Sequence, residues 1–167
     1  SLDNTSTNGM IADADRNIIY MNRSVSAMLK EAEADIRKVM PHFNADEILG
    51  GSMDRFHRDP AHQKGMLDRM QDKHPSEIKV GKRHFRLTAS PILGSKGERI
   101  GTVVEWLDRT KEKEAEQEVA SIVEASLQGN FTKRINEEDK EGFMLTLVQG
   151  LNQLMRTTES GLNEVSN

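Results

Sequence analysis

The sequence contains no cysteine, which excludes disulfide scaffolds, thiol catalysis and metal sites built on thiolates. No apolar run approaches the roughly 18 residues that a membrane-spanning helix needs. No signal-peptide pattern opens the chain. We therefore expect a cytoplasmic chain that belongs to a longer protein, without excluding a membrane anchor elsewhere in that protein.

Positive charge is not in excess, since the formal net charge is −4, and this argues against a nucleic-acid partner. The sequence also lacks a zinc-finger pattern and a glycine-rich phosphate loop. No paired carboxylates and no Ser/His/Asp order emerge from the acidic residues, which stand in turns or on a highly charged segment. We therefore expect that the chain is not an enzyme.

The first 110 residues alternate between strand and helix patterns. Residues 10–13 and 18–22 are short apolar runs around a polar turn and predict a hairpin. Residues 22–30 and 32–40 predict two short helices, the second ended by Pro41. A short turn at 44–51, an irregular stretch at 52–60 and a helix that starts near Pro60 follow.

Three further strands complete this region, at residues 77–80, 84–93 and 99–107, separated by glycine turns. They predict an antiparallel meander with Phe85, Leu87 and Ala89 on one face. The order of hairpin, small helices and meander predicts an α+β domain with one antiparallel sheet and helices on one of its faces.

From Asp108 the chain becomes helical and highly charged. A helix is expected at 111–128, ended by Gly129, followed by a connector at 130–140 and a second helix to the end. The second helix carries a seam at steps of three and four, which comprises Met144, Leu147, Leu151, Leu154, Thr158, Gly161 and Val165. A narrow seam on so polar a helix needs partner helices, so we expect a homodimer through this region.

Residues 1–110, which end in Asp108-Arg109-Thr110, resemble a PAS sensor domain. Residues 111–167 resemble a HAMP relay, because Gly129 is followed by Phe131 and Ile135 at the spacing of a HAMP connector. The resemblance implies a parallel four-helix bundle in a dimer, with Phe131 and Ile135 packed against it. The alternative for this region is an ordinary coiled-coil hairpin.

Two segments, 56–63 and 101–106, resemble the haem-binding PAS domain of aerotaxis-type methyl-accepting chemotaxis receptors. That family has a histidine on a short helix that ligates the haem iron, and His57 matches it. A tryptophan on its last strand hydrogen-bonds the bound gas, and Trp106 matches it. Leu87 is the candidate for the wall of the gas-binding side, and Met53 and Phe56 lie beside His57.

The chemistry of these residues is compatible with haem b. Reversible gas binding usually uses one neutral imidazole as the axial ligand, and the chain offers His42, His57, His62, His74 and His84. His57 is the preferred ligand and His62 the runner-up, although a lone histidine is more often structural or exposed. The indole of Trp106 is a donor that needs an acceptor when buried, although strand tryptophans usually only fill the core. The functional interpretation requires Thr102, Val104 and Trp106 to face the core.

We therefore predict a haem-based oxygen sensor module that passes its ligand state to the HAMP helices. The resemblance implies that a missing signalling domain then acts on a chemotaxis kinase and its adaptor. Two alternatives remain open at this point: a PAS redox sensor that binds flavin (FAD), and a ligand-free PAS domain that serves only in dimerisation and relay.

Overall fold

The computed structural model describes residues 7–166. The chain divides into two compact units, one that ends at Thr110 and one that begins at Lys111. Each unit is described by itself below. Within the described residues, no helix combines the length and the apolar character that crossing a membrane requires.

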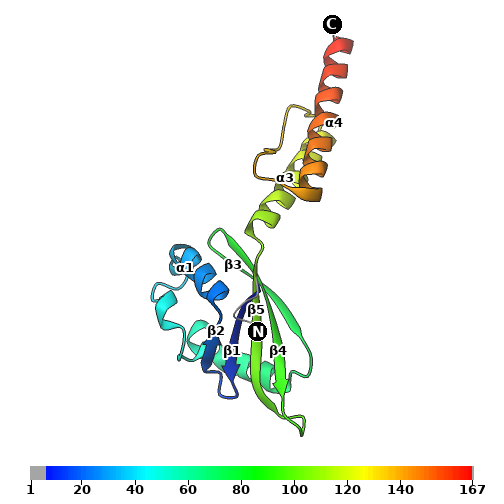
Figure 1. Ribbon diagram of the computed structural model, residues 1–167. Helices are drawn as coiled ribbons and strands as arrows, with labels where there is room; N and C mark the ends of the chain where they lie inside the picture. The colour runs from blue at the N-terminus through cyan, green and yellow to red at the C-terminus, as the bar shows by residue number, and fades with distance from the viewer. Residues whose placement is uncertain (1–6, 167) are drawn as a thin grey trace. The chain divides into compact units, whose positions relative to one another are not determined.

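The first unit contains one five-stranded antiparallel sheet, as predicted (Figure 1). Its strands follow the order β2-β1-β5-β4-β3. β5 therefore lies at the centre, where it pairs Val104 with Met10 of β1 and Trp106 with Leu87 of β4. The strand bounds are Asn8–Asp13 for β1, Ile18–Met21 for β2, His74–Val80 for β3, Arg83–Leu93 for β4 and Arg99–Asp108 for β5.

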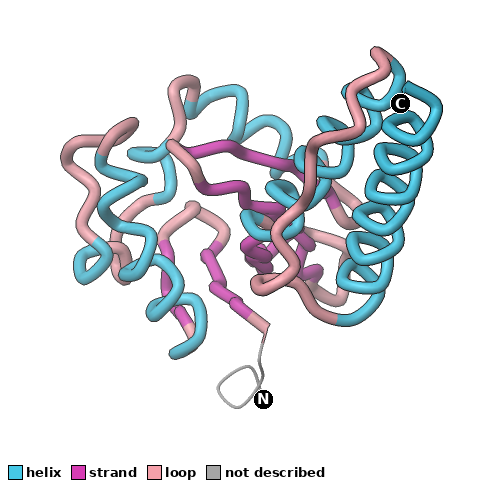
Figure 2. Tube along the Cα trace, turned by 90° about the horizontal axis from the view of Figure 1, so that it is seen from above, coloured by secondary structure: helices cyan, strands magenta, loops and turns pink. Residues whose placement is uncertain are grey.

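All the helices of this unit cover one face of the sheet, as the view from above also shows (Figure 2). They are the α-helices α1 (Arg23–Arg37) and α2 (Pro60–Arg69), and the short 3-10 helices η2 (Ala45–Glu47) and η3 (Met53–Phe56). The prediction that residues 52–60 are irregular was wrong where η3 forms. Ser52 caps this turn, because its side chain accepts a hydrogen bond from the Asp54 N–H.

The prediction of two helices between residues 22 and 40 was wrong, because α1 is continuous. Asn22 caps its start by accepting a hydrogen bond from the Val25 N–H. Its buried residues Val25, Leu29, Ala32 and Ile36 keep steps of three and four throughout, so one face packs on the sheet without a break.

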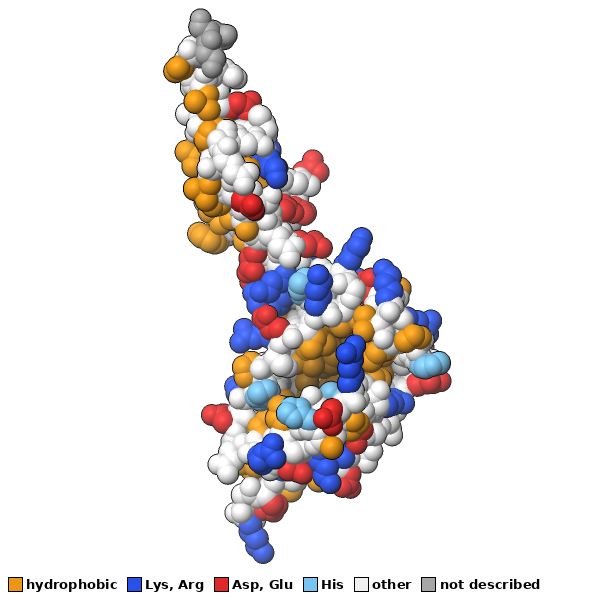
Figure 3. Space-filling view, turned by 180° about the vertical axis from the view of Figure 1, so that it is seen from behind, with side chains coloured by type: hydrophobic (Ala, Val, Ile, Leu, Met, Phe, Trp, Pro, Cys, Tyr) orange, Lys and Arg blue, Asp and Glu red, His pale blue; other side chains and the backbone are white. Residues whose placement is uncertain are grey.

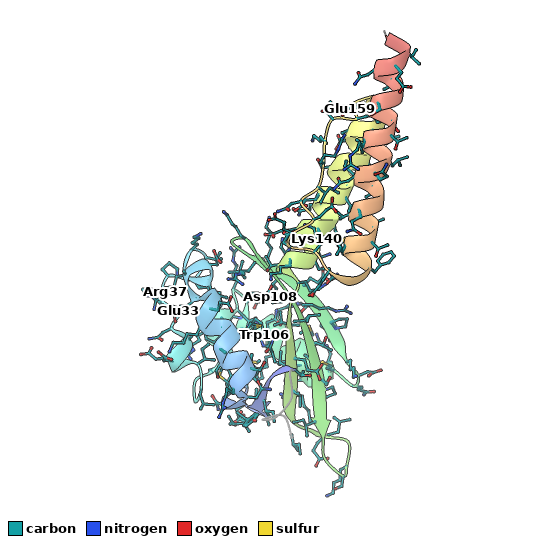
Figure 4. All side chains as sticks on the ribbon, turned by 45° about the horizontal axis from the view of Figure 1, so that its top comes forward. Glu33, Arg37, Trp106, Asp108, Lys140 and Glu159 are labelled. Atoms are coloured by element: carbon teal, nitrogen blue, oxygen red, sulfur yellow. The ribbon has the colours of Figure 1, made fainter. Side chains whose placement is uncertain are left out.

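The loop after α1 is fastened to that helix. The Glu33 carboxylate accepts the Ala45 N–H at 2.9 Å, and Arg37 Nε donates to the Phe43 carbonyl at 2.8 Å. Glu33 and Arg37 lie side by side on α1 (Figure 4). These bonds hold the buried side chain of Phe43 in the core that the helices and the sheet share.

The second unit consists of two helices that run in the same direction (Figure 1). They are α3 (Thr110–Leu127) and α4 (Gly142–Ser166), and the connector between them returns along their length. Gly129 ends α3 in a left-handed conformation, with φ of 82°, which glycine adopts without strain. The parallel direction of α3 and α4 does not fit the coiled-coil hairpin alternative, in which consecutive helices are antiparallel.

The core of the second unit is built from Ile122, Ile135, Val148 and Met155. Phe131 packs against this cluster, so both connector residues pack as predicted. The predicted seam on α4 was offset from the face that this chain buries. Val148 and Met155, which the seam omitted, are buried, while Leu154 of the seam is exposed.

Asn152 joins the connector to α4, and sequence reasoning missed it. Its side chain is buried, accepts the Ile135 N–H at 2.8 Å and donates to the Ile135 carbonyl at 2.8 Å. Two ion pairs fasten the same connector, from Arg134 to Glu159 at 3.3 Å and from Lys140 to Glu118 at 3.2 Å (Figure 4). At Ile135 the Asn152 side chain thus supplies the backbone partners that a helix would otherwise provide.

Candidate functional site

Trp106 lies on the face of β5 that the helices cover, as the sequence alternation predicted. Thr102 and Val104 on the same face are buried, whereas Glu105 and Leu107 on the opposite face are exposed. The indole packs against the core of the unit, and its ring meets Phe85 edge to face, with centroids 5.6 Å apart and planes at 76° (Figure 4).

The indole Nε1–H of Trp106 is buried and has no hydrogen-bond partner within residues 7–166. A buried donor without an acceptor costs about 1–3 kcal/mol. Core packing alone does not explain why such a donor lies on the inner face of the sheet. An acceptor that binds in this core would satisfy it, and this gives the first test of whether the site fits a haem and its gas ligand.

His57 follows η3 directly and is half-buried. Its Nδ1 lies 2.9 Å from the Met53 carbonyl oxygen. A carbonyl only accepts, so this bond requires the proton on Nδ1 and leaves the lone pair of Nε2 available. Metal-ligating histidines are held in this way by a backbone carbonyl or carboxylate on their second nitrogen. His57 therefore has the tautomer that an axial haem ligand requires.

Apolar side chains line the space between η3 and the sheet. Met53, Phe56 and Leu87 are half-buried and pack against the core of the unit, as Trp106 does. The ring of Phe56 is held by Phe43, at 6.0 Å between centroids. Met21, Met28 and Met40 belong to the same half-buried set. Thioether and aromatic side chains suit a flat apolar cofactor, because they adapt to its faces.

A hollow with apolar walls opens on the surface of this unit, with histidine and basic side chains near its rim (Figure 3). A pocket of about 280 Å³ is lined by Phe43 and Phe56 and includes His42 and Arg55. Of the predicted cofactor-site residues it contains Phe56, but His57, Leu87 and Trp106 do not line it.

The other histidines are less suited to ligate haem. His62 lies in the first turn of α2 and is exposed; its backbone N–H donates to Asp59, which caps the helix. His42 and His74 are also exposed. Between residues 7 and 166, no three His, Cys, Asp or Glu side chains gather to hold a metal ion. A haem iron needs only one protein donor, so this finding does not bear on His57.

The end of β5 is held by Arg83, which bridges two elements. Its guanidinium pairs with Asp35 of α1 at 3.2 Å and with Asp108 of β5 at 3.1 Å. Asp108 also accepts the Thr110 N–H at 2.9 Å, and the His84 N–H donates to the Thr110 hydroxyl at 3.1 Å. Asp108 and Thr110 of the predicted exit sequence are thus hydrogen-bonded to each other and, through Thr110, to β4 within the first unit.

The pKa of Asp35 lies below its ordinary value of 3.8, chiefly because Arg83, and then Lys38, donates a hydrogen bond to its carboxylate. Since the pKa is lower in the folded state, the unfolded state takes up the proton first as the pH falls. The pair therefore contributes stability above the unfolded pKa and loses it as the pH drops through the lowered folded value.

This chain belongs to the PAS fold family, whose pattern matches residues 2–114. Because the match covers more than half of the chain, it identifies the class of protein. PAS sensor domains form a non-enzymatic signalling family, which confirms the expectation that the chain is not an enzyme.

Two relatives define the position of the chain within that class. Methyl-accepting chemotaxis protein McpB of Pseudomonas aeruginosa is 49% identical over 166 residues, which are 99% of this chain but 24% of McpB. The structure described as the Aer2 receptor from Vibrio cholerae, a dual PAS-haem oxygen sensor, is 35% identical with a TM-score of 0.54, over 61% of this chain and 93% of that one.

An RNA-binding light-oxygen-voltage receptor shows the same fold at 16% identity and a TM-score of 0.52, over 74% of this chain and 35% of that one. At this identity the likeness concerns the fold alone. The fold of the first unit is therefore shared with sensors of different ligands, and the ligand has to be argued from the residues of the site.

Replacing Asp35 with asparagine should lower the free energy of unfolding at neutral pH, because Arg83 loses one of its two carboxylates. The difference from the wild type should shrink as the pH falls from about 3.8 through the lowered pKa of folded Asp35, because the wild-type carboxylate then becomes protonated. Chemical denaturation at a series of pH values measures this. Asp46→Asn is the control, since its ion pair with Lys30 is exposed and should contribute little. A difference that is independent of pH would contradict the assignment.

Proposed function

We propose that the PAS unit binds haem b through His57 and senses a diatomic gas, with oxygen as the first candidate. The observation that carries the proposal is the buried Nε1–H of Trp106, a donor without an acceptor on the inner face of the sheet. The Nδ1–H of His57 is already engaged by Met53, so its Nε2 is free to ligate. The likeness to the Vibrio cholerae PAS-haem sensor supports the same ligand.

A haem held by His57 would supply an iron atom that can bind a small gas molecule. The residues of this chain would determine which molecule can bind there. The Met53 carbonyl would orient the imidazole through its hydrogen bond, and Phe56 and Leu87 would supply apolar walls for a bound haem. Trp106 offers one directional N–H donor, which favours a ligand with partial negative charge over an apolar one.

The position of Trp106 in the chain suggests how the signal leaves the unit. Trp106 is two residues from Asp108, which Arg83 holds, and four residues from Thr110, where α3 begins. If the indole N–H gains an acceptor when a ligand binds, β5, which carries Trp106, is the element that would move. The bonds among Asp108, Thr110 and His84 then carry this shift to the first turn of α3.

We further propose that the second unit is a HAMP relay that acts as a dimer. Its two parallel helices and the connector held by Asn152 support this assignment. One side of α4 is apolar and exposed: Phe143, Leu154 and Val165 are 79, 61 and 86% exposed. A second copy of the chain would cover this stripe and complete a four-helix bundle.

The 49% identity to McpB supports a role in a methyl-accepting chemotaxis receptor. This chain spans about a quarter of that relative, 24%, so the activity of the whole receptor is an inference. In that setting a signalling segment outside this chain would act, in the cytoplasm, on a chemotaxis kinase and its adaptor. An absorption spectrum of the purified protein tests the ligand: a Soret band supports haem, flavin bands support the FAD alternative, and a colourless protein after haem supply supports a ligand-free relay.

Replacing His57 with alanine should abolish haem retention, because the axial donor is lost. The Soret absorbance relative to protein after gel filtration measures retention. His62→Ala is the matched control, since that imidazole is exposed five residues away, and it should keep full haem. The reverse result, with haem lost only in His62→Ala, would transfer the ligand assignment to His62.

Replacing Trp106 with leucine should leave haem bound but weaken oxygen binding by about 10-fold or more, the loss of one hydrogen bond to a charged acceptor. Oxygen equilibrium and dissociation-rate measurements detect the change. Leu107→Ala alters the next residue of β5 on the exposed face and should leave both values unchanged. Wild-type affinity in Trp106→Leu would exclude the donor role.

Replacing Leu154 with lysine should shift the protein from dimer to monomer, because a charge enters the apolar stripe that the partner covers. Analytical ultracentrifugation over a range of concentrations measures the association. Gln149→Lys places the same charge on another side of α4, also exposed, and should leave the dimer intact. A wild type that stays monomeric would contradict the proposed bundle.

A further inference from the structure

An ion pair joins the turn between β1 and β2 to η3. The guanidinium of Arg16 donates to both carboxylate oxygens of Asp54, with Nε at 2.8 Å from Oδ1 and Nη2 at 3.0 Å from Oδ2. Both side chains are largely shielded, at 14% and 31% exposure. A two-bond arginine–carboxylate pair fixes orientation as well as distance, and partial burial strengthens it.

The same two residues also contact the backbone that holds His57. The Met53 N–H donates to the Arg16 carbonyl at 2.9 Å, and the Met53 carbonyl accepts the imidazole Nδ1–H of His57. The His57 N–H donates to the Asp54 carbonyl at 3.2 Å. Arg16 of the β1–β2 turn therefore bonds to Met53 and Asp54, the two residues whose carbonyls accept hydrogen bonds from the side chain and the backbone of His57.

Arg16 is itself held in an uncommon conformation. Its φ is 67°, and it is the one described residue other than glycine with positive φ. An arginine in this region is strained relative to glycine or asparagine, which adopt it readily. The turn therefore carries a residue that its backbone disfavours, and its side-chain bonds to Asp54 offset that strain. The side chain, rather than the turn geometry, accounts for arginine at this position.

We propose that Arg16 and Asp54 are positioning residues for the His57 imidazole, and that they set the strength of its bond to a haem iron. This inference rests on the proposed haem function. η3 is one short turn, and His57 after it is extended, with φ of −113° and ψ of 137°, so no regular helix fixes the imidazole. The Arg16–Asp54 pair supplies the missing rigidity from the neighbouring hairpin.

A second arginine–aspartate pair in the same unit provides the control. Arg99 contacts Asp68 of α2 at 3.0 Å, and a hydrogen bond from the arginine lowers the pKa of Asp68, as that from Arg16 lowers the pKa of Asp54. The bonds of Arg99 go to Asp68, Ala14 and Thr102, and none goes to η3. Asp68 interacts with Arg16 only through its charge, as a minor contribution, and has no hydrogen bond to η3. Asp54→Asn and Asp68→Asn therefore make the same chemical change, with and without the loss of a hydrogen bond to η3.

The experiment compares wild type, Asp54→Asn, Asp68→Asn and Arg16→Lys as the full chain loaded with haem. The resonance Raman band of the ferrous iron–histidine stretch reports the imidazole bond, and transfer of haem to apomyoglobin reports its loss. Asp54→Asn should shift the band and lose haem about 10-fold faster, the lower range for partners of metal-bound histidines. Arg16→Lys keeps the positive charge but loses the two-bond geometry of the guanidinium, so its band position and haem-loss rate should lie between those of wild type and Asp54→Asn. Both values should match wild type in Asp68→Asn.

Haem-free protein gives a second readout. Long-range ¹H–¹⁵N spectra report the tautomer of His57, which should be the Nδ1–H form in wild type and a mixture in Asp54→Asn. Should Asp54→Asn not fold, Arg16→Lys decides by the same two measurements. The inference would be overturned if the folded Asp54→Asn and Arg16→Lys variants kept the wild-type Raman band, haem-loss rate and His57 tautomer. Changes in Asp68→Asn as large as those in Asp54→Asn would overturn it as well. A wild type that binds no haem would instead overturn the proposed function.

Discussion

The central position of β5 is the constraint on which the rest of the PAS unit depends. Pairing with β1 on one side and β4 on the other fixes its register, so Thr102, Val104 and Trp106 all face the helices. A shift by one residue would turn Trp106 to the exposed face and bury Glu105, which the core would not tolerate. The same strand ends at Asp108, within the hydrogen-bonded junction where α3 begins. One register therefore sets both the inward direction of the Trp106 side chain and the position at which α3 begins.

The candidate pocket lies between two elements with different stability. The sheet side, with Leu87 and Trp106, is fixed by ladders of backbone hydrogen bonds on long strands. The helical side presents His57 after η3, a single turn that holds its place through side chains, among them Arg16 and Asp54. His57 thus follows a single helical turn, whereas Trp106 lies on a strand that is hydrogen-bonded to a neighbour on each side.

In the second unit, packing and hydrogen bonds hold the non-helical connector between α3 and α4 against the two helices. Ile135 supplies apolar contact, and Asn152 satisfies its N–H and carbonyl at once. A buried asparagine is expensive unless both ends of its amide are bonded, and here they are. These two bonds fix the position of Ile135 along α4. The apolar stripe left exposed on α4 is then free for a second copy.

The sequence by itself determined the order of the five strands, the inner face of β5 and the end of α3 at Gly129, because alternation and glycine are local signals. It also marked His57, Trp106, Leu87, Met53 and Phe56, through resemblance more than through chemistry. Only the tertiary structure decided which contacts and hydrogen bonds these residues make. It showed that α1 is unbroken, that Val148 rather than Leu154 is buried, and that Asn152 and the Arg16–Asp54 pair are structural links. Such contacts join residues 17 to 38 positions apart, and no periodicity in the sequence encodes a bond between segments that meet only after folding.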